Sequence, residues 1–247
     1  MLNRYLIIIN SKTLIALGIS IFVLYFAEKY SIDYEIDLTL ISIAIIFPLV
    51  FCIRSAFRRR EKGLEHLSQF RSNLRTIEHY LRMSKLSVDK FKELDVLMNK
   101  LENEFLEELS KPEINLKKID SNTEELFSFL KDNNEEISGG IRAKAIRFLR
   151  DVSDGQDNLI AIYLHRTPIS LKAYCLFFIY LFPLVYTPTI IHKMGNDSDA
   201  MILTSFVVLL SEFILISLYN IQDQMEYPFD DDGLDDIQLQ KFKSKRF

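Results

Sequence analysis

Apolar residues gather into four segments of this chain, and polar residues separate them. Residues 13–27 and 38–53 contain no charged side chain, and each segment has about fifteen residues. A membrane span needs roughly 20 residues, and the tyrosine-bearing stretches before both segments bring them within reach of that length. Residues 173–191 form a full-length span, and residues 200–221 form another that only Glu212 interrupts. The pattern therefore predicts two membrane hairpins.

Between the hairpins, apolar residues recur at three- and four-residue steps, which is typical of one buried helix face. Such series occupy residues 64–81 and 91–106, and a shorter one lies around residues 126–130. The sequence Ser110-Lys111-Pro112 interrupts the pattern, and Gly139-Gly140 opens a last long stretch. We expect a solvated helical bundle continuous with the membrane helices. The alternative is a coiled-coil dimerisation stalk, which the frequent breaks disfavour.

The predicted fold class is an all-α membrane protein with four transmembrane helices in two hairpins and a helical cytosolic block between them. Charged residues make up 26% of the 247 residues, yet mean hydropathy is +0.08, so apolar and charged residues must be segregated. We expect four regions: a first hairpin at 1–53, a cytosolic helical region at 54–167, a second hairpin at 168–222, and an acidic turn with a basic tail at 223–247.

The distribution of charge predicts the orientation. The linkers at residues 28–37 and 192–199 are mainly acidic, whereas basic residues follow the second span and precede the third: Arg54, Arg58, Arg59, Arg60, Lys62, Arg166 and Lys172. An excess of Lys and Arg beside a span marks the cytoplasmic side. Both termini and the middle region are therefore expected to be cytoplasmic, with the basic C-terminal tail at the membrane surface.

Composition argues against several classes of protein. A net charge of −4 disfavours a nucleic-acid binder that relies on phosphate contacts. Two distant cysteines provide neither a disulfide scaffold nor a zinc site built on Cys ligands. The four histidines are scattered, and the sequence has no nucleophile elbow, phosphate-cradling loop or metalloprotease motif, so we do not expect an enzyme.

The residues after the fourth span resemble a family pattern. An acidic residue precedes Tyr227-Pro228-Phe229, and an aspartate-rich run follows. In the bestrophin family of ion channels, an acidic residue, Asn-Pro-Phe-Gly and an Asp-rich run come directly after the fourth membrane helix. This chain is similar, although Tyr227 stands where the family usually has Asn and Asp230 where it has Gly. The order of hairpin, helical block, hairpin and acidic turn also fits.

The second span carries a further resemblance. Ile43, Phe47 and Phe51 are four residues apart, hence on one helix face. They resemble the three apolar residues of the bestrophin pore neck, and Arg59 resembles the Arg that follows two turns later, but the family's Trp pair after that Arg is absent. The resemblance implies a pentamer whose apolar rings gate by dewetting. Ordinary packing or lipid contact is the alternative, and Pro48 is expected to free the carbonyl of Ala44 and kink the helix.

Two further features of the pore follow from the resemblance. Thr167, just before the third span, matches a second constriction by position. It is equally expected to cap that helix, with Pro168 at the first helical position, and the two roles can coexist. Arg54, Arg58 and Arg59 are expected either to form a positive vestibule that concentrates anions or to anchor the helix at lipid headgroups.

The acidic run is a candidate calcium site. Calcium takes six to eight oxygen ligands, which clustered Asp side chains and backbone carbonyls supply. The bestrophin resemblance implies the ligands Asp231, Asp232 and Asp235, with Asp236 replacing Asp235 if one residue is inserted. The alternative is a solvated acidic turn paired with nearby basic residues.

The predicted function is an oligomeric, bestrophin-like channel for monovalent ions, with anions such as chloride as the first choice. Its expected partners are further copies of itself, the lipid membrane and the permeant ions. A cation-conducting homologue and a non-conducting membrane scaffold or sensor are the alternatives. Glu212 is expected to point into the helix bundle, because an ionisable side chain facing lipid is costly.

Overall fold

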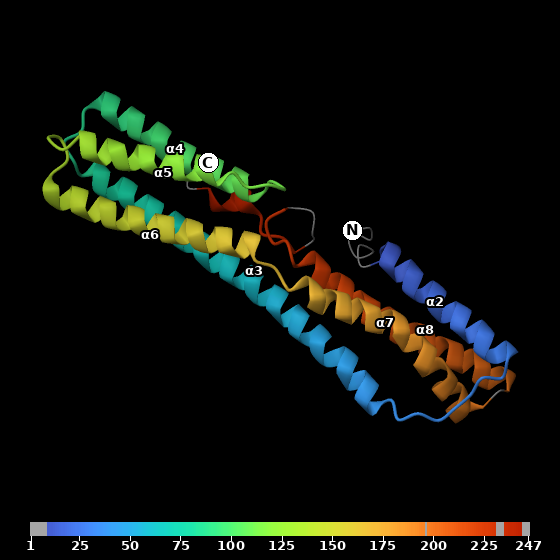
Figure 1. The fold of residues 1–247 in the computed structure, drawn as a ribbon. Helices are drawn as coiled ribbons and strands as arrows, with labels where there is room; N and C mark the ends of the chain where they lie inside the picture. Colours follow the sequence, from blue (N-terminus) through green and yellow to red (C-terminus); the bar gives the residue numbers. More distant parts are fainter. Residues whose placement is uncertain (1–8, 196, 231–234, 244–247) are drawn as a thin grey trace. The chain divides into compact units, whose positions relative to one another are not determined.

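The computed structural model describes residues 9–195, 197–230 and 235–243, and all regular structure in this part of the chain is helical (Figure 1). The helices are α2 (Ser11–Lys29), α3 (Thr39–Arg82), α4 (Val88–Leu109), α5 (Leu116–Asp132), α6 (Gly139–Leu164), α7 (Ile169–Met194), α8 (Ser198–Gln224) and the short 3-10 helix η2 (Leu239–Phe242). The predicted all-α fold class is confirmed. The second apolar span and the first amphipathic series form one continuous helix of 44 residues, α3.

Local sequence signals explain where several helices begin and end. The side chain of Asn10 accepts hydrogen bonds from the first turn of α2, and Thr13 completes a capping box. The side chains of Ser87 and Asn115 cap α4 and α5, each by accepting one hydrogen bond from a backbone N–H in the first turn of its helix. After α7, Gly195 adopts a φ of 89°, a conformation that favours glycine over residues with a Cβ atom.

The chain divides into two compact units. The first, which we call the membrane unit, comprises Met1–Arg58 and Thr167–Glu226. The second, which we call the helical unit, comprises Arg59–Arg166 and Tyr227–Phe247. Helix α3 contributes its first part to the membrane unit and its second part to the helical unit.

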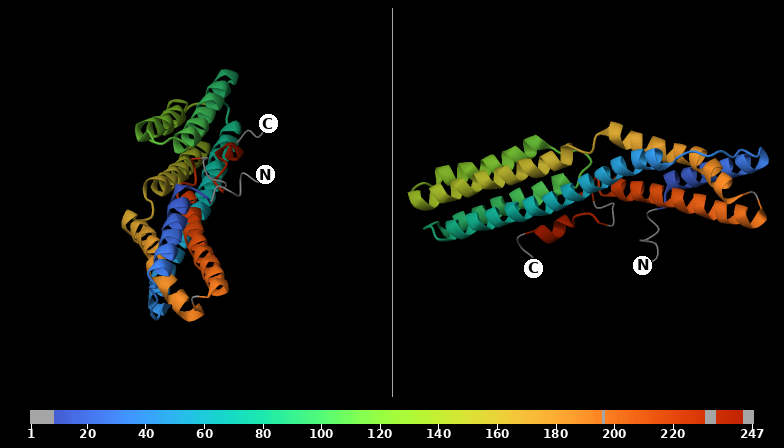
Figure 2. Two further views of the ribbon diagram at one scale, coloured as in Figure 1. Left: turned by 90° about the vertical axis from the view of Figure 1, so that its right-hand side faces the viewer. Right: turned by 90° about the horizontal axis from the view of Figure 1, so that it is seen from below.

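The helical unit is built from amphipathic helices that bury their apolar faces against one another. Helix α4 runs beside α5, and α5 beside α6 (Figure 2). The predicted series along residues 64–81 supplies the α3 side of the core, where Leu67, Phe70, Leu74, Ile77 and Leu81 are almost fully buried. The ring centroids of Phe70 and Phe105 lie 4.8 Å apart. Apolar burial of this kind is the dominant stabilising contribution.

In the membrane unit, α2, α7 and α8 pack on one another, and the first part of α3 shares a smaller apolar core with them. Four stretches of helix are long and apolar enough to cross a membrane: in α2, in α3, in the run from α6 to α7, and in α8. These correspond to the four predicted spans. The chain therefore has the helices of an integral membrane protein.

Candidate functional site

The three predicted neck residues lie on an open apolar face of α3. Ile43, Phe47 and Phe51 are 45%, 57% and 58% exposed in the single chain, and the two phenyl rings have their centroids 6.3 Å apart. Ile45 and Leu49 are buried in the core of the membrane unit. The structure thus places the three predicted neck residues on one face of α3, where each side chain keeps about half of its surface exposed. In water such a face would be costly, so it is suited to lipid or to another protomer.

Of the basic residues that follow the predicted neck, some are exposed and others make contacts within the chain. Arg54 and Arg58 are exposed, whereas Arg59 is partly buried. In the helical unit, Nε of Arg60 donates a hydrogen bond to the backbone carbonyl of Asp235. Arg60 therefore helps to hold the acidic turn on α3, a role that the sequence did not indicate.

Thr167 is buried where the chain enters α7. It is 3% exposed, and its backbone N–H donates a 2.6 Å hydrogen bond to Oε1 of the buried Glu226. The N-cap of α7 is Pro168, whose side chain makes no capping hydrogen bond, and the helix begins at Ile169. The interpretation of Thr167 as the helix cap is therefore wrong, because Pro168 occupies the cap position and the helix starts one residue later.

A network of charged groups that sequence reasoning missed joins three helix ends in the membrane unit. Asp223, at the end of α8, accepts 2.6 Å hydrogen bonds from Lys12 on α2 and Lys172 on α7. Nearby, Nδ2 of Asn220 donates to Oγ1 of Thr13 at 2.9 Å. No local sequence pattern indicates this network, because Lys12 and Lys172 lie 211 and 51 residues before Asp223 in the chain. The network fixes the ends of α2, α7 and α8 relative to one another.

Part of the acidic run can be described. Asp231 and Asp232 lie outside the described residues, Asp235 is exposed, and Asp236 is half-buried. The described side chains include no group of three or more His, Cys, Asp or Glu gathered for a metal. Since two of the predicted ligands lie outside this part of the chain, the calcium site stays a prediction.

The segment around the acidic run is anchored by apolar and aromatic contacts within the helical unit. Phe229 and Ile237 are buried, and a Cβ atom on Gly63 of α3 would meet them at 3.2 and 3.1 Å. The N–H of Ile237 donates to the carbonyl of Pro228 at 2.8 Å. The Arg166 guanidinium lies 3.9 Å from the centroid of the Tyr227 ring, a cation–π contact. Gly63 therefore gives this segment its close approach to α3.

Glu212 lies inside the membrane unit, as expected. It is fully buried on α8, and within the described chain neither carboxyl oxygen has a hydrogen-bond partner. An unpaired carboxylate in such surroundings would cost several kcal/mol, so the neutral, protonated form is favoured here.

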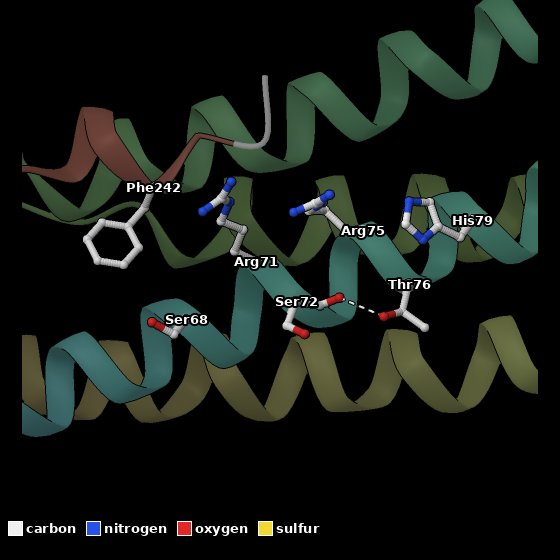
Figure 3. A pocket seen from close by; sticks show the side chains of 7 residues that line it. All are labelled: Ser68, Arg71, Ser72, Arg75, Thr76, His79 and Phe242. Atoms are coloured by element: carbon white, nitrogen blue, oxygen red, sulfur yellow. Dashed lines mark hydrogen bonds between the residues drawn. The ribbon is translucent and has the colours of Figure 1, made fainter. Parts of the chain in front are cut away.

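A polar cavity of about 260 Å³ borders α3 in the helical unit (Figure 3). Arg71, Arg75 and His79 extend from one side of the helix, with Phe242 of η2 beside them. The hydroxyl of Thr76 donates back to the carbonyl of Ser72 at 2.8 Å. The cavity is an open basic groove, and no motif in the sequence indicates it.

Comparisons with known proteins identify the fold. No protein-family model matches the chain, and a search of curated proteins found no significant match. Among solved structures, a bacterial bestrophin homologue from Klebsiella pneumoniae is similar with a TM-score of 0.76 at 14% identity, covering 94% of this chain and 93% of that one. Two variants of the Klebsiella pneumoniae homologue, each carrying a substitution to threonine, give TM-scores of 0.75 and 0.73 at 14% and 15% identity, over 94% of this chain and 93% and 94% of theirs. The predicted likeness to bestrophins is thus confirmed at the level of the fold.

Proposed function

We propose that this chain, with its bestrophin fold, forms an oligomeric membrane channel for monovalent ions. The proposed assembly is a pentamer with the first part of α3 around the axis, so that Ile43, Phe47 and Phe51 form three stacked apolar rings. Such rings oppose ion passage by dewetting when they are narrow. The proposed permeant ions are anions, chloride first, because the edges of phenyl rings carry a partial positive charge.

The single observation that carries this proposal is the open apolar face of α3. All three neck side chains are about half exposed in the single chain, on a helix whose Ile45 and Leu49 are buried. Further copies of the chain would cover this face and enclose a conduit. Lipid contact alone would cover it as well, so an experiment has to separate the two.

The remaining parts of the channel are proposed around this neck. Exposed Arg54 and Arg58 follow it along α3, and together with Arg59 they would concentrate anions at the cytoplasmic end. Thr167 is proposed as a second constriction and the acidic run as a calcium site. Residues 54–167 and both termini would then be cytoplasmic.

Ion flux from liposomes tests the neck. We expect purified protein to pass chloride, and Phe47→Ala with Phe51→Ala to raise that flux several-fold, because smaller side chains lower the dewetting barrier. Phe177→Ala with Phe206→Ala is the matched control, since these two phenylalanines are 61% and 62% exposed on α7 and α8. Unchanged flux in the neck variant would remove the neck proposal.

The same preparation separates the alternatives. Potassium flux without chloride flux would identify a cation-conducting homologue. A monomer or dimer in mild detergent, with no flux of either ion, would favour the non-conducting scaffold. The particle mass, measured with and without calcium, reports both the subunit number and any dependence on the acidic run.

A further inference from the structure

At two of the prolines inside the helices of the membrane unit, a tyrosine completes the backbone hydrogen bonding that the proline interrupts. Pro48 in α3 has no N–H to offer the carbonyl of Ala44, and Pro188 in α7 has none for the carbonyl of Leu184. The hydroxyl of Tyr174 donates to the Ala44 carbonyl at 3.3 Å. The hydroxyl of Tyr34 donates to the Leu184 carbonyl at 3.1 Å. The predicted release of the Ala44 carbonyl thus has a specific consequence in the fold.

The tyrosine contacts matter because a membrane offers no water to these carbonyls. An unsatisfied carbonyl in hydrocarbon is costly, so proline in a spanning helix depends on a neighbouring group to satisfy it. Tyr174 belongs to α7, and its ring packs against that of Phe178, with the two ring centroids 4.5 Å apart. Each tyrosine supplies from another segment the donor that the proline removed.

The Tyr174 contact lies at the level of the neck. Ala44 is next to Ile43 in sequence and three residues before Phe47. On the other side of α3, Ile45, Leu49 and Cys52 share a core with Cys175 and Ile179 of α7. The hydroxyl of Tyr174 therefore binds α3 between two of the predicted neck residues, at the carbonyl that Pro48 leaves without a donor. The Tyr34 hydroxyl binds α7 instead, away from these residues.

We propose that Tyr174 is a positioning residue of the neck: its hydroxyl replaces the missing N–H of Pro48 and so restrains the backbone of α3 between Ile43 and Phe47. This inference rests on the proposed function, because it assigns the neck to α3. Without the hydroxyl, the helix is free to flex at Pro48. The neck side chains then spend more time apart, and the dewetting barrier falls.

A double-mutant cycle tests the replacement directly. Pro48→Ala restores an amide that can bond to the Ala44 carbonyl within α3, and this makes the tyrosine hydroxyl redundant. We expect Tyr174→Phe to lower the melting temperature of the protein with Pro48 and to leave it unchanged in the Pro48→Ala background. An equal decrease in both backgrounds would overturn the replacement, since the hydroxyl would then stabilise the protein independently of the proline.

Chloride flux tests the link to the neck. We expect Tyr174→Phe to raise basal flux about fivefold, the factor that loss of one hydrogen bond produces in an equilibrium. Tyr34→Phe is the matched control: it removes the same kind of bond from a different proline, and we expect unchanged flux. Equal flux changes in the two variants would overturn the positioning role.

Melting temperature and chloride flux together distinguish failure of the Tyr174 proposal from failure of the channel proposal. Absence of flux from the wild-type protein would overturn the proposed function, and with it the link between Tyr174 and conduction. The melting temperatures would still decide whether Tyr174 replaces the amide. Flux that responds to the neck variant but not to Tyr174→Phe would retain the channel and reject the positioning role.

Discussion

The two units place their large apolar side chains in opposite ways. In the helical unit the large apolar residues of α3 point inward, and Phe70, Leu74 and Ile77 are at most 2% exposed. In the membrane unit the same helix carries Phe47, Phe51 and other large apolar residues on its outside. One continuous helix thus meets two kinds of surroundings. The first part is suited to lipid or to further protomers, and the second part to water.

Buried polar groups differ between the units in a related way. Glu108 of the helical unit is almost fully buried, and its carboxylate binds Lys111 at 2.7 Å and the N–H of Asn115 at 3.1 Å. Glu212 of the membrane unit is fully buried, and its carboxyl oxygens have no partner within the described residues. The helical unit therefore stabilises a charge, whereas the membrane unit favours a neutral group. The difference indicates which substitutions each unit tolerates.

The largest effect is expected from truncating a phenylalanine in the helical unit. Phe105→Ala removes a ring that is 1% exposed and contacts Phe70, and we expect a loss of about 4 kcal/mol of unfolding free energy. Phe51→Ala, at a ring that is 58% exposed in the single chain, should cost under about 1 kcal/mol. Denaturant unfolding monitored by circular dichroism measures both. Equal losses would contradict the contrast between the units.

A smaller effect, with a defined pH dependence, is expected for Glu108. Hydrogen bonding from Lys111 is the main cause that holds the pKa of Glu108 below its ordinary value of 4.5. The folded state therefore favours the ionised form, so this stability is present above pH 4.5 and is lost as the pH falls through the lowered pKa. Glu108→Gln should cost about 1 to 2 kcal/mol at pH 7, because the bond to the charged lysine is weakened.

Melting curves between pH 7 and pH 3 check the prediction for Glu108. The variant should lose less stability on acidification than the wild-type protein. An identical pH dependence in the two proteins would show that the carboxylate of Glu108 contributes nothing to the acid sensitivity.

The smallest effect is expected for Glu212→Gln. Glutamine has nearly the same shape as a protonated glutamate, so the melting temperature at pH 7 should stay the same or rise. Glu108→Gln is the matched comparison, since it makes the same chemical change at a carboxylate that has partners. A marked decrease for Glu212→Gln would show that the ionised carboxylate is required, which would contradict the assignment of a neutral group.

Much of the fold could be predicted because apolar periodicity reflects burial along single helices. The four spans, the amphipathic series at residues 64–81 and 91–106, and the breaks near Ser110 and Gly139 all correspond to observed features. The pairing of Asp223 with Lys12 and Lys172 could not be predicted, since it joins residues that only the fold brings together. The start of α7 was misplaced by one residue, because Thr and Pro both favour helix starts and the sequence does not decide between them.

The candidate site was predictable only in part, because a sequence pattern shows which residues share a helix face but not which other segments contact that face. Four-residue spacing places Ile43, Phe47 and Phe51 on one face of α3, but spacing does not say what covers that face. The release of the Ala44 carbonyl follows from Pro48 alone, whereas the donor that replaces the amide comes from Tyr174, which lies 130 residues away in the sequence.

The membrane unit also contains two thiols in contact, Cys52 of α3 and Cys175 of α7, with their sulfur atoms 4.0 Å apart. Joining them needs an approach to about 2.05 Å, a small movement for two side chains that are buried in the same core. An oxidant that reaches the core could therefore cross-link α3 to α7 through a disulfide, without any engineered residue. Reduction would break the cross-link, which makes the two native cysteines a reversible reporter of whether α3 and α7 separate.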